Sequence, residues 1–144
     1  MDILEQIFDQ GYAVKTLKLG KGKVKADVRN LSTSNQLDIE QDLSKVKDSS
    51  SAYVLHKYSI GILSHTLLKY NGKTFKNPKE TEKFLLELPT AVCDALITGQ
   101  NQFEKEVANT ITPAKVQDTF FEQGSTQEKS EQSPEVLSSE NQEA

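Results

Sequence analysis

Residues 12–30 alternate between apolar and polar side chains in two short runs, which the tripeptide Gly-Lys-Gly separates. In the second run Val24, Ala26 and Val28 share one face, and charged residues lie between them. A period of two is typical of an antiparallel strand with one buried face, and glycine adopts the positive φ angles of tight hairpin turns. We therefore expect a β-hairpin over residues 12–30. Because an isolated hairpin is barely stable in water, its apolar face has to pack against helices.

Much of the remaining sequence up to residue 110 has the spacing of amphipathic helices. Thr33 and Gln36 match a capping box at the start of one helix. The next helix is apolar around most of its circumference, which predicts the central helix of the core, and a close packing contact is expected at Gly61 within it. The tetrapeptide Tyr-Asn-Gly-Lys is expected to stop this helix, with a left-handed residue there. The expected helices cover residues 2–9, 33–46, about 50–70, 78–88 and 89–110.

The charge is unevenly distributed along the chain. The net charge is −4, while residues 113–144 contain seven acidic and two basic residues, so that the first 112 residues have a net charge of +1. The segment 113–144 is also rich in Ser, Gln and Glu, a composition typical of disorder. The sequence therefore predicts a mostly helical α+β domain over residues 1–112. In it, the N-terminal hairpin packs on four to five helices, and a flexible acidic tail follows.

The acidic segment contains a short apolar cluster. Val116, Phe120 and Phe121 have helical spacing within residues 116–122. Two interpretations carry equal weight: these side chains fold back as a last helical turn, or they form a short linear motif that docks in a partner's groove. Under the second interpretation they are candidate partner-binding residues.

Basic residues are concentrated in the predicted hairpin. They could contact phosphates, although no aromatic residue alternates with them, and single-strand binders need rings on which bases stack. They could instead form the solvated face and edges of the hairpin, which protects a sheet from edge-to-edge pairing. We favour the second interpretation, with a remaining role in meeting an acidic protein surface or the acidic tail. The candidate residues are Lys15, Lys18, Lys21, Lys23, Lys25 and Arg29.

Signatures of catalysis and of bound cofactors are missing from the sequence. The chain has one cysteine and two histidines, which cannot form a standard zinc site alone. No phosphate-binding loop, nucleophile elbow or zinc-protease motif occurs. Lysine and histidine interrupt the most apolar window, so no membrane span is expected, and the N-terminal residues do not resemble a signal peptide. We expect an intracellular protein that is not an enzyme and needs no cofactor or metal.

The helical half resembles the small tail assembly chaperones of long-tailed bacteriophages. The matching features are a helix that runs from Ile60 to the Asn71–Gly72 turn, and a second helix with the pattern Leu-Pro, apolar residues, Asp and Leu-Ile. The resemblance spans roughly residues 12–110, and related baseplate-assembly proteins share it. The second helix matches at Leu88, Pro89, Val92, Asp94, Leu96, Ile97 and Phe103.

The resemblance implies a non-enzymatic role. Such chaperones bind the long helical tape-measure protein, keep it soluble and recruit tail-tube proteins. The expected location is then the cytoplasm of the infected bacterial host, and an oligomeric state is left open. The first alternative is a structural component of the phage baseplate or tail hub, which would be found in the virion. The second alternative is a nucleic-acid-binding protein that uses the basic hairpin.

Overall fold

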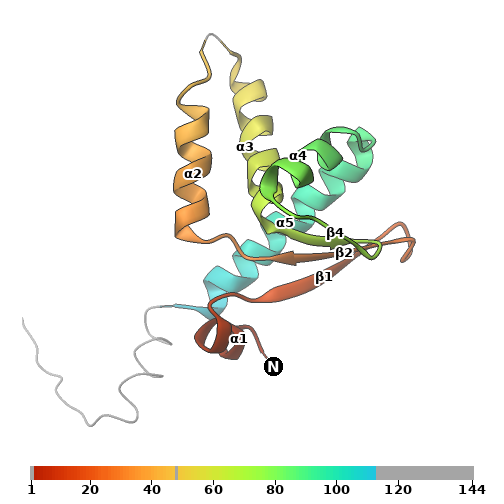
Figure 1. Cartoon of the computed structure of the whole chain (residues 1–144). Helices are drawn as coiled ribbons and strands as arrows, with labels where there is room; N and C mark the ends of the chain where they lie inside the picture. The colour runs from red at the N-terminus through yellow and green to blue at the C-terminus, as the bar shows by residue number, and fades with distance from the viewer. Residues whose placement is uncertain (1, 48, 113–144) are drawn as a thin grey trace, which may run out of the picture. The chain divides into compact units, whose positions relative to one another are not determined.

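The computed structural model describes residues 2–47 and 49–112 of the chain. By its contacts the chain divides into two units, Met1–Ala108 and Asn109–Ala144, and the description below concerns the first unit and the end of its last helix. The described residues form the predicted α+β fold, with four strands and five helices (Figure 1). The elements are α1 (Ile3–Gln10), β1 (Val14–Leu19), β2 (Val24–Arg29), α2 (Thr33–Leu43), α3 (Ser51–Thr66), β3 (Leu67–Tyr70), β4 (Lys73–Thr74), α4 (Pro78–Leu86) and α5 (Thr90–Thr110).

The hairpin that the sequence predicts is present as β1 and β2, which pair antiparallel along their whole length. Its faces are the predicted ones, because Leu17, Ala26 and Val28 are all buried. Gly20 and Gly22 have φ angles of 57° and 88°. The turn therefore uses the backbone region in which glycine has no steric penalty.

The helix expected over residues 50–70 ends four residues early, at Thr66, so the prediction was wrong for its last turn. The following residues form β3, which pairs with β2, and β4 completes an antiparallel sheet in the order β1-β2-β3-β4. Asn71 and Gly72 have φ angles of 48° and 87° and form the turn between β3 and β4. Lys25 of β2 explains the change, because its N–H donates to Asn71 Oδ1 and its carbonyl accepts from the Asn71 N–H, both at 2.8 Å.

The start of α2 differs from the predicted capping box. Ser32 caps the helix, and its Oγ accepts from the N–H of Asn35 at 3.1 Å. Thr33 is therefore the first helical residue and not the cap. Serine and threonine are both good caps, so the sequence located this helix start to within one residue.

α5 packs against the hairpin and forms the centre of the core. Its buried stripe includes Leu96 and Phe103, as the helical spacing predicts. Gly99 lies so close to β1 that a Cβ atom there would be 2.7 Å from Leu17 Cδ1. In Figure 1, α5 passes behind the strands. Glycine at this position allows the hairpin to approach the helix axis closely.

α3 is only partly a core helix, which corrects the sequence-based expectation. Its second half buries Ile60 and Leu63, and Gly61 lies against Ile39 of α2, as expected for a glycine with a packing role. The first half is different, because Tyr53 and Leu55 are 52% and 66% exposed. The apolar circumference of α3 therefore did not predict how much of the helix is buried.

Candidate protein-interaction surface

Four of the six candidate basic residues of the hairpin are exposed: Lys18, Lys21, Lys23 and Lys25. Lys18 and Lys25 are direct partners across the two strands, on the face opposite the buried Leu17 and Ala26. Like charges directly opposite each other on a sheet repel. Their placement matches the solvated face that the sequence predicts, and it concentrates positive charge.

The other two candidate basic residues contact side chains of the same unit. Lys15 Nζ lies 2.7 Å from Glu106 Oε1, and both side chains are about half exposed. Because exposed ion pairs contribute at most about 1 kcal/mol, this pair adds little to stability. The Arg29 guanidinium lies 4.1 Å from the ring centroid of Tyr12, a cation–π distance. The hairpin therefore has an aromatic neighbour that the spacing of its lysines did not reveal.

The third strand extends the basic face of the hairpin. Lys69 of β3 pairs with Asp27 of β2, and Lys69 is exposed. Asp27 Oδ1 also accepts a hydrogen bond from Thr16 Oγ1 at 2.7 Å. Lys69 is not among the predicted basic residues, because the apolar pattern of residues 50–70 predicts a helix there. The Asn-Gly dipeptide two residues later was the signal that could have placed it in a hairpin.

Three aromatic rings meet where β3, β4 and α4 come together, and we call them the aromatic cluster. The ring centroids of Tyr70 and Phe84 are 4.9 Å apart, and those of Phe75 and Phe84 are 5.2 Å apart. All three side chains are half-buried. Lys73 Nζ lies 5.2 Å from the Phe84 centroid and 5.8 Å from that of Phe75. The cluster therefore presents partly exposed rings beside a positive charge.

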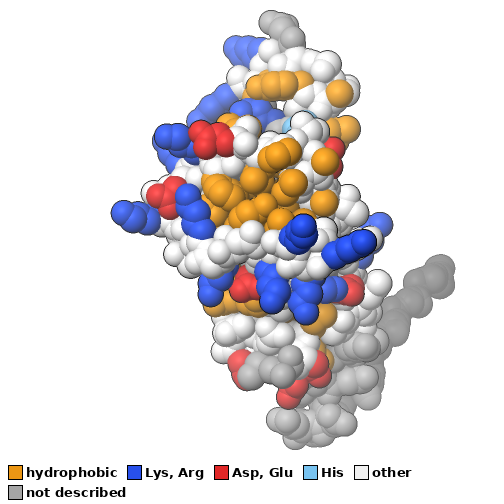
Figure 2. All heavy atoms as spheres, turned by 90° about the vertical axis from the view of Figure 1, so that its right-hand side faces the viewer, with side chains coloured by type: hydrophobic (Ala, Val, Ile, Leu, Met, Phe, Trp, Pro, Cys, Tyr) orange, Lys and Arg blue, Asp and Glu red, His pale blue; other side chains and the backbone are white. Residues whose placement is uncertain are grey.

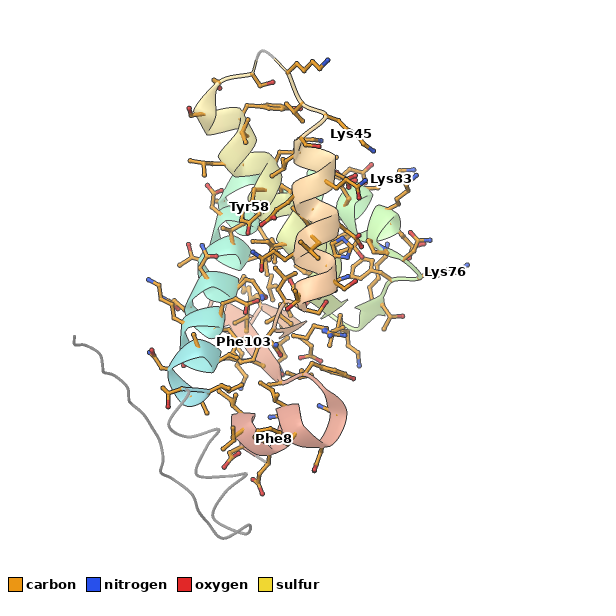
Figure 3. The ribbon with its side chains drawn as sticks, turned by 90° about the vertical axis from the view of Figure 1, so that its left-hand side faces the viewer. Phe8, Lys45, Tyr58, Lys76, Lys83 and Phe103 are labelled. Atoms are coloured by element: carbon orange, nitrogen blue, oxygen red, sulfur yellow. The ribbon has the colours of Figure 1, made fainter. Side chains whose placement is uncertain are left out.

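The side of the molecule that carries the β3–β4 turn shows both apolar and basic side chains. The β3–β4 turn, next to Tyr70, lies on the right-hand side of Figure 1. Seen from that side, hydrophobic side chains gather in one area, with Lys and Arg side chains around it (Figure 2). Residues 69–83 contain five lysines against two glutamates. Figure 3 shows Lys76 and Lys83 of this segment pointing outward, while Phe103 lies in the interior.

A groove of about 470 Å³ lies between α2, α3 and the start of α4. Its lining includes Ile39 and Gly61, where the two helices touch. The groove carries charged groups of both signs. Its ionisable lining residues are Asp38, Asp42, Lys57, His65, Lys79 and Glu82. Within residues 2–47 and 49–112, no group of three His, Cys, Asp or Glu side chains is placed to hold a metal ion.

A polar contact between α5 and the end of β2 fixes the sheet to the helix. Gln100 Nε2 donates to the carbonyl of Arg29 at 3.0 Å and to Glu104 Oε2 at 2.8 Å. The same Glu104 oxygen accepts from the N–H of Leu31 at 2.7 Å. Burial raises the pKa of the Glu104 carboxyl, and its two hydrogen bonds oppose that shift. Among the described residues, Gln100 Oε1 is a buried acceptor without a hydrogen-bond partner.

Cys93 is buried near the start of α5, as expected for a small core thiol. Burial and, to a smaller extent, the negative charge of Asp94 raise the pKa of its thiol. The thiol is therefore protonated at neutral pH, and a protonated thiol is a poor nucleophile.

The second group of predicted site residues, Val116, Phe120 and Phe121, lies outside the described residues. Their partner-binding role stays a prediction. Of the helices that the structure describes, none has the length and apolar character needed to cross a membrane.

Comparisons with protein-family models, with curated proteins and with solved structures found no match to this chain.

Proposed function

We propose that the protein is a non-enzymatic binding protein that assists the assembly of other proteins, and specifically a tail assembly chaperone of a long-tailed bacteriophage. The observations that carry the first part are the aromatic cluster, whose half-buried rings lie beside the Lys73 ammonium group, and a face on which hydrophobic side chains gather among Lys and Arg side chains (Figure 2). Contiguous exposed apolar surface with a polar rim is typical of protein-interaction sites. The exposed Tyr53 and Leu55 of α3 add further apolar surface.

The resemblance to phage tail chaperones supports the second part of the proposal. Pro89 precedes α5, and Leu96 and Phe103 lie in its buried stripe, so the part of the matching pattern after Pro89 lies on one amphipathic helix. The other matching feature differs in detail, because β3 separates the end of α3 from the Asn71–Gly72 turn. Under this proposal the partners are the tape-measure and tail-tube proteins of the same phage, bound in the cytoplasm of the infected cell.

Affinity purification of the tagged full-length chain from infected bacteria tests the proposal. We expect the tape-measure protein to co-purify, and we expect purified virions to lack the chain. Stoichiometric copies in virions would instead make the protein a component of the baseplate or tail hub. A variant with Phe120→Ala and Phe121→Ala, compared with the unchanged chain, tests whether these two residues contribute to capture.

A gel-shift titration with single-stranded and double-stranded DNA tests the nucleic-acid alternative. A phosphate-binding hairpin should bind at low salt and lose affinity steeply as salt rises, because binding releases counterions. We expect no shift at low salt. A salt-sensitive shift that Lys18→Glu and Lys25→Glu abolish would favour the nucleic-acid function over the chaperone function.

A further inference from the structure

We propose that the aromatic cluster is a docking site for an amphipathic helix with acidic flanks on another protein. The proposal rests on the protein-binding function above and identifies the surface and the chemistry of the partner. Tyr70, Phe75 and Phe84 would receive the apolar stripe of the helix, and the surrounding lysines would pair with its carboxylates.

The geometry of the rings favours an apolar partner. Adjacent ring centroids are 4.9 and 5.2 Å apart, and the ring planes are inclined by 64° and 52°. The rings thus pack against one another edge-on or tilted. A patch of this kind suits leucine and phenylalanine side chains, which a helix presents on one face at positions i, i+3 and i+4.

The charge around the rings favours an acidic partner. Lys73 holds its ammonium group above two of the rings, and Lys76 lies beside Phe75 in the sequence and points outward (Figure 3). The excess of lysine in residues 69–83 continues onto the hairpin, where Lys18 and Lys25 face each other. Opposite charge on a partner would relieve this repulsion and speed the encounter.

The same features disfavour a nucleic acid as the occupant. Single-stranded nucleic acids stack successive bases on exposed ring faces. Here the Phe84 ring contacts both other rings, all three are half-buried, and the Lys73 ammonium lies above two of them. Successive bases would therefore find no row of free ring faces at the aromatic cluster.

The probe for the test is a fluorescently labelled synthetic peptide of about 20 residues, long enough to form a helix on binding. It has leucine and phenylalanine on one face and glutamate on both flanks. A matched peptide carries lysine in place of each glutamate. Fluorescence anisotropy with the full-length chain should show that the acidic peptide binds at least about tenfold more tightly at low salt, and that this preference shrinks as salt screens the charges.

Paired variants locate the binding surface. Lys73→Glu with Lys76→Glu should weaken binding of the acidic peptide about tenfold or more. The control pair, Lys45→Glu with Lys47→Glu, makes the same change in net charge just after α2 and should weaken binding less. Phe75→Ala should weaken the binding of both peptides about fivefold. Its control, Tyr58→Ala, removes a half-buried aromatic side chain from α3 and should leave the binding of both peptides unchanged. Far-ultraviolet circular dichroism checks that each variant is folded, and the lysine variants test the surface even if Phe75→Ala unfolds the chain.

Several results would overturn the proposal. Equal binding of the acidic and basic peptides contradicts the charge argument, as does equal weakening by the two lysine pairs. A labelled single-stranded oligonucleotide could bind more tightly than the acidic peptide. If Lys73→Glu with Lys76→Glu abolished that binding, the surface would be a nucleic-acid site. If the tape-measure protein still co-purifies with the Lys73→Glu, Lys76→Glu chain, the proposed function stands and this surface does not mediate it.

Discussion

α5 and α3 are the longest helices in the described part of the chain, and they use their apolar residues differently. α3 is the more apolar of the two in sequence. Even so, α5 buries Leu96 and Phe103 almost completely, whereas Leu55 near the start of α3 is 66% exposed. The difference arises from what lies opposite each helix. α5 faces the hairpin, while the first half of α3 extends beyond the contacts that bury its second half.

The largest expected effect comes from comparing a buried side chain of α5 with an exposed side chain of α3. Phe103→Ala removes a ring that is 1% exposed, so we expect the free energy of unfolding to fall by about 3–5 kcal/mol. Leu55→Ala on the exposed half of α3 should change it by less than about 0.5 kcal/mol. Urea unfolding followed by circular dichroism measures both. Similar losses for the two variants would contradict the comparison.

A second pair of variants compares how closely a neighbouring side chain packs against a glycine of each helix. An added Cβ at Gly99 would be 2.7 Å from Leu17 Cδ1, whereas one at Gly61 would be 3.0 Å from Ile39 Cγ2. Both changes to alanine gain up to about 1 kcal/mol of helix propensity, but overpacking of the core costs about 1–3 kcal/mol. We expect Gly99→Ala to destabilise by about 1 kcal/mol and Gly61→Ala to be close to neutral in the same urea assay. The reverse order would show that α2 and α3 pack more rigidly than α5 and the hairpin.

A smaller effect is expected at the start of α3. Ser50 caps this helix, and its Oγ accepts from the N–H of Tyr53 at 3.2 Å. Because the first turns bury little, Ser50→Ala should increase local opening and change global stability by only a few tenths of a kcal/mol. Amide hydrogen exchange should become faster in residues 51–56 and stay unchanged in α5. A uniform increase across both helices would mean that they unfold as one unit.

The smallest expected effect concerns pH at the contact between α5 and β2. The pKa of Glu104 is raised above its ordinary value of 4.5, so the folded state binds this proton more tightly than the unfolded chain does. The resulting stabilisation is complete below the unfolded pKa and is lost as the pH rises through the folded pKa. The Glu104→Gln variant has no titrating group at this position and serves as the reference. As the pH falls from neutral to about 4.5, the melting temperature of the unchanged chain should therefore rise relative to that of Glu104→Gln. A constant difference in melting temperature over this range would contradict the shift.

The hairpin and the last helix were predictable because their signals are local. The alternation of Val24, Ala26 and Val28 located β2, and the spacing of Leu96 and Phe103 located α5. The sheet beyond the hairpin was not predicted, because the apolar residues before Asn71 fit a helix as well as a strand. Of its two further strands, β3 pairs with β2, which is about 40 residues away in the sequence, and β4 pairs with β3.

The candidate surface was predicted only in part, for a similar reason. The basic residues of the hairpin could be identified from charge and alternation, and the structure exposes four of the six. The aromatic cluster could not, because Tyr70, Phe75 and Phe84 come from β3, the following loop and α4. No helical or strand period connects these three positions. The contacts of Phe84 with the other two rings join segments that the sequence pattern does not connect.

The sequence by itself determined the hairpin, the positions of most helices and the excess of lysine in residues 12–30, because period, turn chemistry and charge are properties of neighbouring residues. Only the tertiary structure decided that β2 has a second partner strand and that the first half of α3 is exposed. It also decided that three separate rings meet beside Lys73. These features depend on which surfaces lie opposite one another, and burial and strand pairing follow from that arrangement rather than from local propensity.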